Sequence, residues 1–416
     1  MAHGGMVVGL DLGTTKICAV IAERSEADVL AIIGVGNSPS EGLRRGVVVD
    51  VEKTVQSISK AVTEAQLMAG VEVSSVYAGI AGEHIGATNS RGVIAVGGGQ
   101  EEIGESDRER VIESARAVAA VPIDREILHV LPQEYRVDDQ CGIRDPIGMS
   151  GVRLETNVHI VTGAVTSAQN ICKSILRAGI EVRDIVLEPL ASSHAVLEDD
   201  EREMGICLLD VGGGTTDLAV FRGGTVKHTG VIGLGGQNVT NDVAVGLRTS
   251  WGNAEAIKCD AGTALVSMAG DGEVVEVPGI GDRPPKVMPR SDLGEIIEPR
   301  MEEIFTLARD RLVGFGLEQP FASGALSAGL VLTGGGALLQ GAVELAEEVF
   351  QVPVRLGIPS GFAGMTEGVA SPIYATALGL VLFGSENPIS GMGQARPSDL
   401  AEGRFEQVIR RMKEWF

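Results

Sequence analysis

A repeated glycine and threonine loop constrains this chain more than any other feature of its sequence. The segment VVGLDLGTTKICAVI at 7–21 returns, with one extra glycine, as ICLLDVGGGTTDLAVF at 206–221. Each copy has an apolar, β-rich run that ends in an Asp, a Gly/Thr turn and a second β-rich run. This order predicts two hairpins with tight loops. Two matched loops predict a clamp that holds one ligand from both sides.

The residue types in the two loops favour a phosphate-bearing ligand. Glycines let backbone N–H groups approach an anion without obstruction by a Cβ atom, and threonine hydroxyls add donors. The loop residues are Gly13, Thr14, Thr15, Gly212, Gly213, Gly214, Thr215 and Thr216. Lys16 supplies a positive point charge. A single copy would equally well be an ordinary glycine turn, but two matched copies favour ATP.

An acidic residue ends the first strand of each predicted hairpin, Asp11 in one and Asp210 in the other. These carboxylates carry the wrong charge to touch phosphate directly. Mg²⁺ prefers a few carboxylates and several waters. We therefore expect both residues to hold Mg²⁺, mostly through water.

A third glycine cluster lies in VLTGGGALLQGAVELAEEVF at 331–350 and predicts a strand, a loop and a helix. It has neither the GxGxxG spacing of a dinucleotide site nor the GK[ST] ending of a P-loop. Two hairpins with this third loop resemble the superfamily of actin, sugar kinases and heat-shock chaperones. The resemblance implies an α/β fold with a nucleotide cleft, and it places Gly334, Gly335 and Gly336 beside the adenosine.

The same resemblance marks three further residues. NAEAIK at 253–258 is similar to a superfamily helix whose Glu and Lys touch the ribose, here Glu255 and Lys258, although a surface salt bridge would look alike. Glu188 precedes Pro189, as in chaperone-type members that use this Glu near the attacking water. A carboxylate at an ordinary helix start is the alternative. The implied catalytic residues are Glu188, Asp210 and Asp11.

Composition narrows the class of protein. With 416 residues the chain is long enough for two or more domains. Its net charge of −22 argues against a nucleic-acid partner, since phosphate backbones attract basic surfaces. The five cysteines have no CxxC spacing, which favours a reducing cytoplasm. We expect no export signal, and no apolar run reaches the roughly 18 residues that a transmembrane helix needs.

The C-terminal sequence RFEQVIRRMKEWF at 404–416 combines an apolar stripe with basic residues. A helix of this length extends about 20 Å, too short to span a bilayer. Its pattern predicts an in-plane anchor on an anionic membrane, or else a helix docked on the protein's own core. The predicted membrane residues are Phe405, Ile409, Arg410, Arg411, Met412, Lys413, Trp415 and Phe416. Residues 385–403 are rich in Gly, Pro and Ser and predict a flexible linker.

The clamp, the third loop and the tethered basic helix together resemble the FtsA family of bacterial cell-division proteins. GLGGQNVTNDVAVGLRT at 233–249 and ILHVLPQEYRVD at 127–138 are also similar to that family. The resemblance implies an actin/chaperone-ATPase-like fold: two RNase H-like domains around the nucleotide cleft, a family-specific inserted subdomain and a C-terminal amphipathic helix. It implies a peripheral protein at the cytoplasmic face of the membrane, at the division site. There it binds ATP, with at most slow hydrolysis, polymerises with itself, anchors FtsZ filaments and recruits later division proteins.

The expected division of the chain follows from this resemblance. The units are 1–84 with about 161–195 for the first domain, 85–160 for the insert, 196–245 with about 326–384 for the second domain, 246–325 for its small lobe, 385–403 for the linker and 404–416 for the membrane helix. Ser106 is expected to cap a helix in the insert, and Ser291 a helix in the small lobe. By resemblance, Arg300 on the latter helix contacts the FtsZ C-terminal peptide, although a solvated charged face is the default.

Three other classes of protein share the core pattern. A sugar or acetate kinase would not need the C-terminal helix and would carry a substrate-side Asp that the sequence does not place. A chaperone ATPase would need a peptide-binding domain after the clamp. A pilus-assembly ATPase would bind the cytoplasmic tail of a pilus membrane protein instead of that of FtsZ.

Overall fold

The computed structural model describes residues 5–25, 29–97, 102–281, 283–315, 325–365 and 367–387. The predicted C-terminal helix at 404–416 and residues 388–403 of the predicted linker lie outside these ranges. Within them, no helix is both long and apolar enough to cross a membrane.

The first domain is built on a six-stranded sheet with the order β11-β6-β1-β2-β3-β19. Its strands are β1 (Met6–Leu12), β2 (Lys16–Arg24), β3 (Leu30–Pro39), β6 (Ser75–Ile80), β11 (Glu181–Leu187) and β19 (Ala363–Gly364). The β1–β2 pair is the predicted antiparallel hairpin, and β6 and β11 run parallel to β1. Helices α1 (Val51–Ala69) and α3 (Val165–Arg177) bury their apolar sides against one face. The ribbon β4 (Leu43–Arg44) and β5 (Val47–Val48) lies between β3 and α1 in the chain.

The second sheet repeats the first. Its order is β14-β13-β12-β17-β18, and its strands are β12 (Ile206–Val211), β13 (Thr216–Arg222), β14 (Thr225–Ile232), β17 (Gly329–Thr333) and β18 (Val354–Leu356). As in the first sheet, the first three strands in the chain are antiparallel and the last two run parallel to the first. The sequence repeat is therefore a repeat of the fold, and the predicted actin-like α/β architecture is confirmed.

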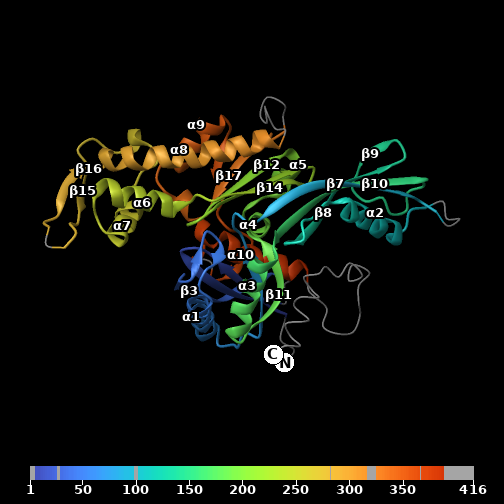
Figure 1. Cartoon of the computed structure of the whole chain (residues 1–416), viewed down its shortest axis with the longest axis horizontal. Helices are drawn as coiled ribbons and strands as arrows, with labels where there is room; N and C mark the ends of the chain where they lie inside the picture. The colour runs from blue at the N-terminus through green and yellow to red at the C-terminus, as the bar shows by residue number, and fades with distance from the viewer. Residues whose placement is uncertain are drawn as a thin grey trace.

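Two helices, α4 (Glu188–Val196) and α10 (Ala375–Glu386), lie between the two sheets (Figure 1). Their side chains share one buried core with strands of both sheets. They cross so closely that a Cβ atom on Gly379 would lie 1.8 Å from the carbonyl oxygen of Ala191. Only glycine permits this contact between backbones.

The end of the described chain returns to the first domain. β19 pairs with β3, and Leu380 of α10 is buried with Tyr77 and Val186 of the first sheet. The sequence-based division instead assigned 326–384 to the second domain as a block. The difference arises because α10 is apolar on all sides and packs against both sheets.

The remaining elements outside the inserted sheet include helices α8 and α9, whose buried side chains share one core with the second sheet. The long helix α8 runs along the upper side of Figure 1, and the ribbon β15–β16 lies at its left end. These elements are α5 (Asp199–Met204), α6 (Gly236–Leu247), α7 (Trp251–Ala261), η1 (Val266–Met268), β15 (Val274–Val277), β16 (Lys286–Pro289), α8 (Arg290–Gly314), η2 (Gly335–Leu338), α9 (Ala342–Phe350) and η3 (Pro372–Tyr374).

An inserted four-stranded sheet projects to the right in Figure 1. Its order is β7-β10-β8-β9, and its elements are β7 (Gly86–Ala95), α2 (Glu105–Val118), β8 (Arg125–Val137), β9 (Gln140–Ile143) and β10 (Arg153–Ala164). Helix α2 packs Val111 and Ala115 against one face. The other face reaches β14, where Nε2 of His159 lies 2.9 Å from Oγ1 of Thr229.

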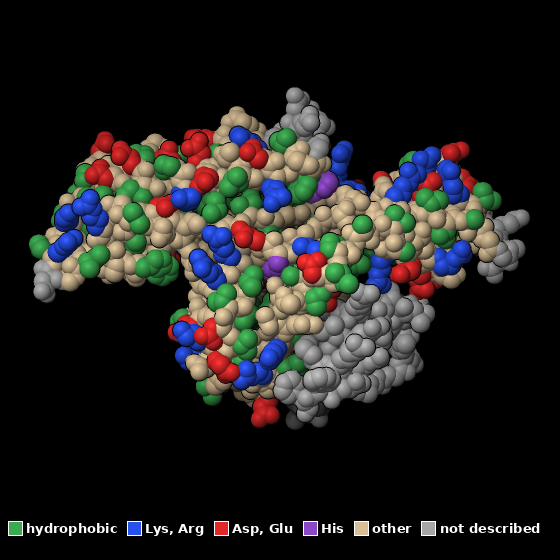
Figure 2. Space-filling model, in the orientation of Figure 1, with side chains coloured by type: hydrophobic (Ala, Val, Ile, Leu, Met, Phe, Trp, Pro, Cys, Tyr) green, Lys and Arg blue, Asp and Glu red, His purple; other side chains and the backbone are tan. Residues whose placement is uncertain are grey.

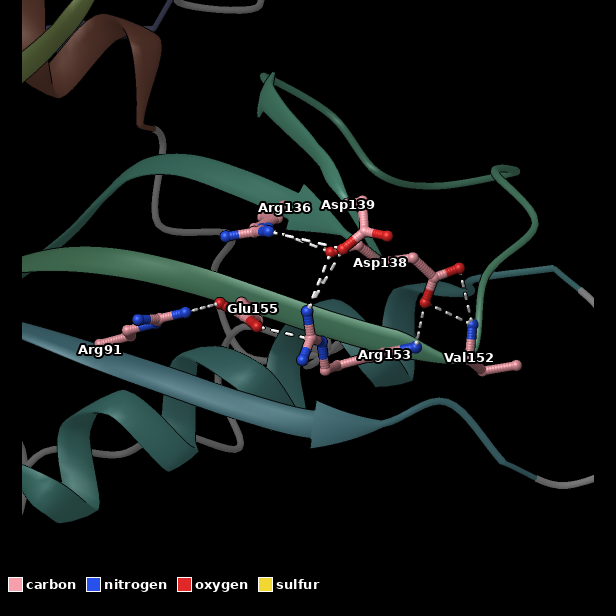
Figure 3. A network of polar contacts seen from close by, with 7 residues as sticks. All are labelled: Arg91, Arg136, Asp138, Asp139, Val152, Arg153 and Glu155. Atoms are coloured by element: carbon pink, nitrogen blue, oxygen red, sulfur yellow. Dashed lines mark hydrogen bonds and ion pairs between the residues drawn. The ribbon is translucent and has the colours of Figure 1, made fainter.

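Ion pairs stabilise the outer half of this sheet (Figure 3). Glu155 is 4% exposed, and its carboxylate lies between Arg91 and Arg153, with 3.1 Å to Nε of Arg153. The hydrogen bond from Arg91 lowers the pKa of Glu155. Figure 2 shows Lys and Arg side chains gathered at this end of the molecule with acidic side chains among them.

Both predicted serine caps are wrong. Helix α2 begins at Glu105, and the Asp107 carboxylate, not Ser106, accepts the hydrogen bond from the N–H of Gly104. Helix α8 begins at Arg290, directly after β16 ends, so Ser291 lies inside its first turn. The helices start where the preceding segment turns, which serine preference alone does not determine.

Candidate functional site

The two hairpin loops and the third glycine loop surround one cavity of about 490 Å³ between the sheets. A volume of this size suits a nucleotide-sized ligand. All the residues predicted for the nucleotide and Mg²⁺ line the cavity except Thr216: Asp11, Gly13, Thr14, Thr15, Lys16, Glu188, Asp210, Gly212, Gly213, Gly214, Thr215, Glu255, Lys258, Gly334, Gly335 and Gly336. Residues more than 300 positions apart in the chain thus meet at one site.

The hairpin loops touch each other at two glycines. A Cβ atom on Gly213 would lie 2.5 Å from Cγ2 of Thr15, and one on Gly214 would lie 2.5 Å from Oγ1 of Thr14. Real Cβ atoms do not approach other atoms this closely. The glycines therefore serve the close approach of the two domains as well as any contact with phosphate.

The third loop needs glycine for two other reasons. Gly334 has φ 84°, a left-handed conformation that glycine adopts without strain. A Cβ atom on Gly336 would lie 2.4 Å from Cγ1 of Val211 at the end of β12. The loop is therefore pressed against the strand that carries Asp210, at the opening of the cavity.

Besides Glu255 and Asp260 on α7, four carboxylates line the cavity: Asp11, Glu188, Asp210 and Asp217. Burial raises the pKa of Asp11 to about 7 and that of Asp217 to about 8, with the charge of Asp210 as a further cause in both cases. Burial, followed by the charge of Asp11, raises the pKa of Glu188 well above its ordinary value. So much clustered negative charge favours a cationic ligand in the cavity.

Sequence reasoning missed Asp217. It is 3% exposed, its Oδ2 accepts a 2.8 Å hydrogen bond from Oγ1 of Thr215, and its buried Oδ1 has no hydrogen-bond partner among the described residues. Asp217 pairs directly with Asp210 across the hairpin, so both side chains point to the same face of the sheet. The sequence could have revealed Asp217, because the two Asp residues stand at equal distances on either side of the loop and are therefore expected to pair across the hairpin.

Two hydroxyl residues that contact Asp210 were missed as well. Ser192 on α4 donates a 2.7 Å hydrogen bond to Oδ2 of Asp210, and Oγ1 of Thr376 on α10 lies 3.4 Å from the same oxygen. They come from parts of the chain with no shared motif, so no local pattern marks them.

The predicted ribose pair lies on the far side of the cavity, on α7. Nζ of Lys258 lies 2.8 Å from Oε2 of Glu255 and donates to Oγ1 of Thr240 over 2.9 Å. Although burial opposes it, the hydrogen bond from Lys258 contributes to a lowered pKa of Glu255. The pair is thus fixed from α6 before any ligand binds. Cys259, next to it, also lines the cavity.

Lys16 and Thr216 differ from the simple expectation. Nζ of Lys16 donates to the carbonyl oxygen of Ile373 over 2.9 Å and lies 4.0 Å from the ring centroid of Tyr374. Its charge is therefore held at the edge of the cavity by η3. Thr216 is fully buried and donates to the carbonyl oxygen of Leu234, which ties β13 to the start of α6.

The donor set fits hydrated Mg²⁺ better than a metal held by protein alone. Among the described residues, no three Asp, Glu, His or Cys side chains are grouped to hold a metal ion. Asp11 and Asp210 face the cavity from opposite hairpins, and Mg²⁺ in phosphate sites commonly keeps one or two carboxylates, several waters and phosphate oxygens. These residues therefore suit Mg²⁺ that arrives with a phosphate ligand.

Arg300 lies on α8, away from the cavity lining. Its Nε lies 2.5 Å from Oδ2 and its Nη2 3.2 Å from Oδ1 of Asp242 on α6, and it also pairs with Glu303. The Arg300 side chain is 27% exposed. The guanidinium is therefore partly accessible and already oriented by a carboxylate on its own domain.

Solved structures share this fold. A PilM–PilN type IV pilus biogenesis complex matches with a TM-score of 0.66 at 18% identity, covering 91% of this chain and 98% of that one. MreB5 of Spiroplasma citri bound to ADP matches with a TM-score of 0.54 at 14% identity, covering 93% and 99%. At these identities the likeness shows the fold alone.

Sequence comparisons are more specific. A family model described as "Cell division protein FtsA" matches residues 207–379, and one described as "SHS2 domain inserted in FTSA" matches residues 82–162. Cell division protein FtsA of Pseudomonas aeruginosa is 48% identical over 99% of this chain and 97% of its own. The Neisseria meningitidis protein is 45% identical over 89% and 88%, and that of Escherichia coli 40% over 99% and 97%. The chain belongs to the FtsA family of cell division proteins.

Proposed function

We propose that the chain binds ATP with Mg²⁺ between its two domains, polymerises on the cytoplasmic face of the membrane at the division site and anchors FtsZ filaments there. The observation that carries the ATP part is the meeting of both hairpin loops and the third loop at one cavity lined by carboxylates. The ADP-bound MreB5 structure, which shares the fold, supports the same choice of ligand.

The proposal gives the following tasks to residues of the cavity. Backbone N–H groups of Gly13, Gly213 and Gly214 bind phosphate oxygens, whereas the N–H of Gly212 donates to the carbonyl oxygen of Thr215 and closes the loop. Glu255 with Lys258 holds the ribose. Asp11 and Asp210 hold Mg²⁺ mostly through water, and the ion supplies charge neutralisation at the phosphates. Glu188 orients the attacking water, and Asp217 can accept its proton through the unpaired Oδ1.

Hydrolysis by this arrangement is slow. Without Mg²⁺, burial among other carboxylates raises the pKa values of Glu188 and Asp217, and the family resemblance implies that ATP turnover is at most slow. We therefore assign the nucleotide mainly to switching between conformations. Fast ATP turnover by isolated monomers would contradict this assignment.

The membrane role rests on the sequence of residues 404–416 and on family membership. One short amphipathic helix binds reversibly, so self-association would make attachment firm through avidity. Family membership supports the division-site location and the recruitment of later division proteins. The net charge of −22 is compatible with a body held off an anionic surface by the linker at 385–403.

Flotation with anionic liposomes tests the proposal. Full-length protein and a truncation to residues 1–403 are each mixed with ATP, Mg²⁺ and FtsZ. We expect only the full-length protein to float and to carry FtsZ with it. If neither protein floats, the membrane role is wrong, and if the full-length protein floats without FtsZ, the anchoring role is wrong.

The FtsZ contact is tested at Arg300. Because Asp242 already orients its guanidinium, a carboxylate on the FtsZ C-terminal peptide would meet a preset donor. Arg300→Glu should lower affinity for that peptide at least about tenfold, as expected for the loss of a charge-assisted hydrogen bond. Arg309→Glu is the matched control, since it makes the same charge change on the same helix. Equal affinities for the two variants would reject the assignment.

A further inference from the structure

We propose that Ser192 and Thr376 are positioning residues that orient the Asp210 carboxylate toward Mg²⁺. The inference deepens the proposed function and rests on it. The two side chains come from helices that pack on the first domain, whereas Asp210 belongs to the second sheet.

The hydrogen bonds form a short chain that ends on one oxygen. Oγ of Ser192 donates to Oδ2 of Asp210 over 2.7 Å, and Oγ of Ser192 lies 3.0 Å from Oγ1 of Thr376. Since a serine hydroxyl has one proton, which Asp210 receives, Thr376 is the donor to Ser192. The longer 3.4 Å separation between Thr376 and Oδ2 agrees with this order. Thr376 thus orients Ser192, and Ser192 orients Asp210.

Only one oxygen of Asp210 is used in this way. Both hydroxyl oxygens lie within 3.4 Å of Oδ2, whereas Oδ1 lies beside Gly334 of the third loop, where a Cβ atom would come within 2.3 Å of it. The hydrogen bond to Oδ2 restricts rotation of the carboxylate and leaves Oδ1 for water or a cation. Fixing a ligand group in this way is how outer residues raise metal affinity.

The neighbouring Ser193 shows that the Ser192 contact is not ordinary helix chemistry. Buried serines in helices usually donate to a carbonyl oxygen one turn back, and Ser193 does so, with 2.7 Å to the carbonyl oxygen of Leu190. Ser192 is fully buried on the same helix but donates instead to a carboxylate of the other domain. Ser192 and Ser193 are both buried and differ in their hydrogen-bond acceptor, so Ser193 is a matched control for substitution of Ser192.

The test compares ATP affinity in Mg²⁺ and in EDTA for the full-length protein and three variants. We expect Ser192→Ala to lose at least about tenfold of the Mg²⁺-dependent gain in affinity, the effect of losing a hydrogen bond to a charged group. Thr376→Val should lose less, and Thr376→Ser should retain the wild-type gain. Ser193→Ala should match the wild type, and affinities in EDTA should be unchanged throughout.

The outcomes separate this inference from the proposed function. If Ser192→Ala keeps the full Mg²⁺-dependent gain in ATP affinity of the wild type, the inference is wrong but the proposed function is not affected. A wild-type protein without any Mg²⁺-dependent gain overturns the metal assignment and the inference together. Circular dichroism and thermal melting show whether Ser192→Ala folds. If it does not, Thr376→Val is compared with Thr376→Ser instead. Equal Mg²⁺-dependent gains in ATP affinity for these two variants would overturn the inference.

Discussion

The backbone N–H of Leu187 donates a hydrogen bond of 2.9 Å to Nε2 of His129. Leu187 ends β11 and immediately precedes Glu188, the carboxylate that lines the cavity, while His129 lies on β8 of the inserted sheet. Burial lowers the pKa of His129 to about 4, so the imidazole stays neutral and can accept this bond near neutral pH. The insert is therefore joined directly to the chain at the edge of the candidate nucleotide site.

Removal of this acceptor should destabilise the protein. His129→Leu leaves the buried N–H of Leu187 without a partner, which costs about 1–3 kcal/mol. The free energy of unfolding, measured by urea denaturation, should fall by that amount. His129→Gln, whose amide oxygen can accept a hydrogen bond, should recover part of the loss. A His129→Leu variant as stable as the wild type would contradict the role of the bond.

His159 should make the protein less stable in mild acid. Its Nδ1 lies 2.6 Å from Oδ1 of Asn89, and burial, followed by His228, lowers its pKa to about 4. Above the unfolded pKa of about 6.5, neither state binds the proton. As pH falls from about 6.5 to about 4, only the unfolded state takes it up, so the free energy of unfolding falls by up to about 1.4 kcal/mol per pH unit. His159→Asn should show a shallower fall in urea titrations across this window, and an unchanged slope would refute the assignment.

The contact between the hairpin loops predicts a sensitive glycine. Gly213→Ala would place a Cβ atom against Thr15, and relief of such overpacking costs about 1–3 kcal/mol. Because the strain lies at the loops, ATP affinity should fall about tenfold or more. Gly252→Ala on α7, where the added Cβ meets nothing within 4 Å, is the control and should bind ATP normally. Isothermal titration calorimetry distinguishes the two, and equal affinities would exclude a closed clamp.

Cysteine footprinting can locate the ligand without any substitution. Cys259 and Cys141 are both exposed, but only Cys259 lines the cavity. At about ten times its Kd, ATP with Mg²⁺ should slow alkylation of Cys259 about tenfold by mass action. Alkylation of Cys141 on β9 should not change. Peptide mass spectrometry reads both sites at once, and equal rates at Cys259 with and without ATP would place the ligand elsewhere.

The fold was predicted from the local sequence repeat. The errors of the prediction concern features that the local sequence does not determine. The two hairpins were predicted because each is a continuous segment with strand, turn and strand in order, and the FtsA family followed from their combination with other segments. The beginnings of α2 and α8 were wrong because Ser106 and Ser291 are good caps in general, whereas Asp107 and the end of β16 decide the start here. The packing of α10 against both sheets was not predicted, because an all-round apolar helix can pack on either sheet.

The site was predictable only where its residues sit in a motif. The glycine loops, Asp11 and Asp210 belong to contiguous patterns, and the structure brings them together. Ser192 and Thr376 are 184 positions apart and meet only because α4 and α10 cross. Asp217 was within reach of sequence reasoning, because its position opposite Asp210 follows from the length of the loop.

At Gly379 and Ala191 the backbones of α10 and α4 are in direct contact. A layer of side chains between helices absorbs small rotations, and no side chain separates the two backbones at this point. Helix α4 begins at the cavity with Glu188, and α10 ends beside Asn387, whose carbonyl oxygen accepts a 3.1 Å hydrogen bond from the hydroxyl of Tyr77. Because the two backbones touch at Gly379 and Ala191, any displacement of α4 at this point would have to displace α10 as well.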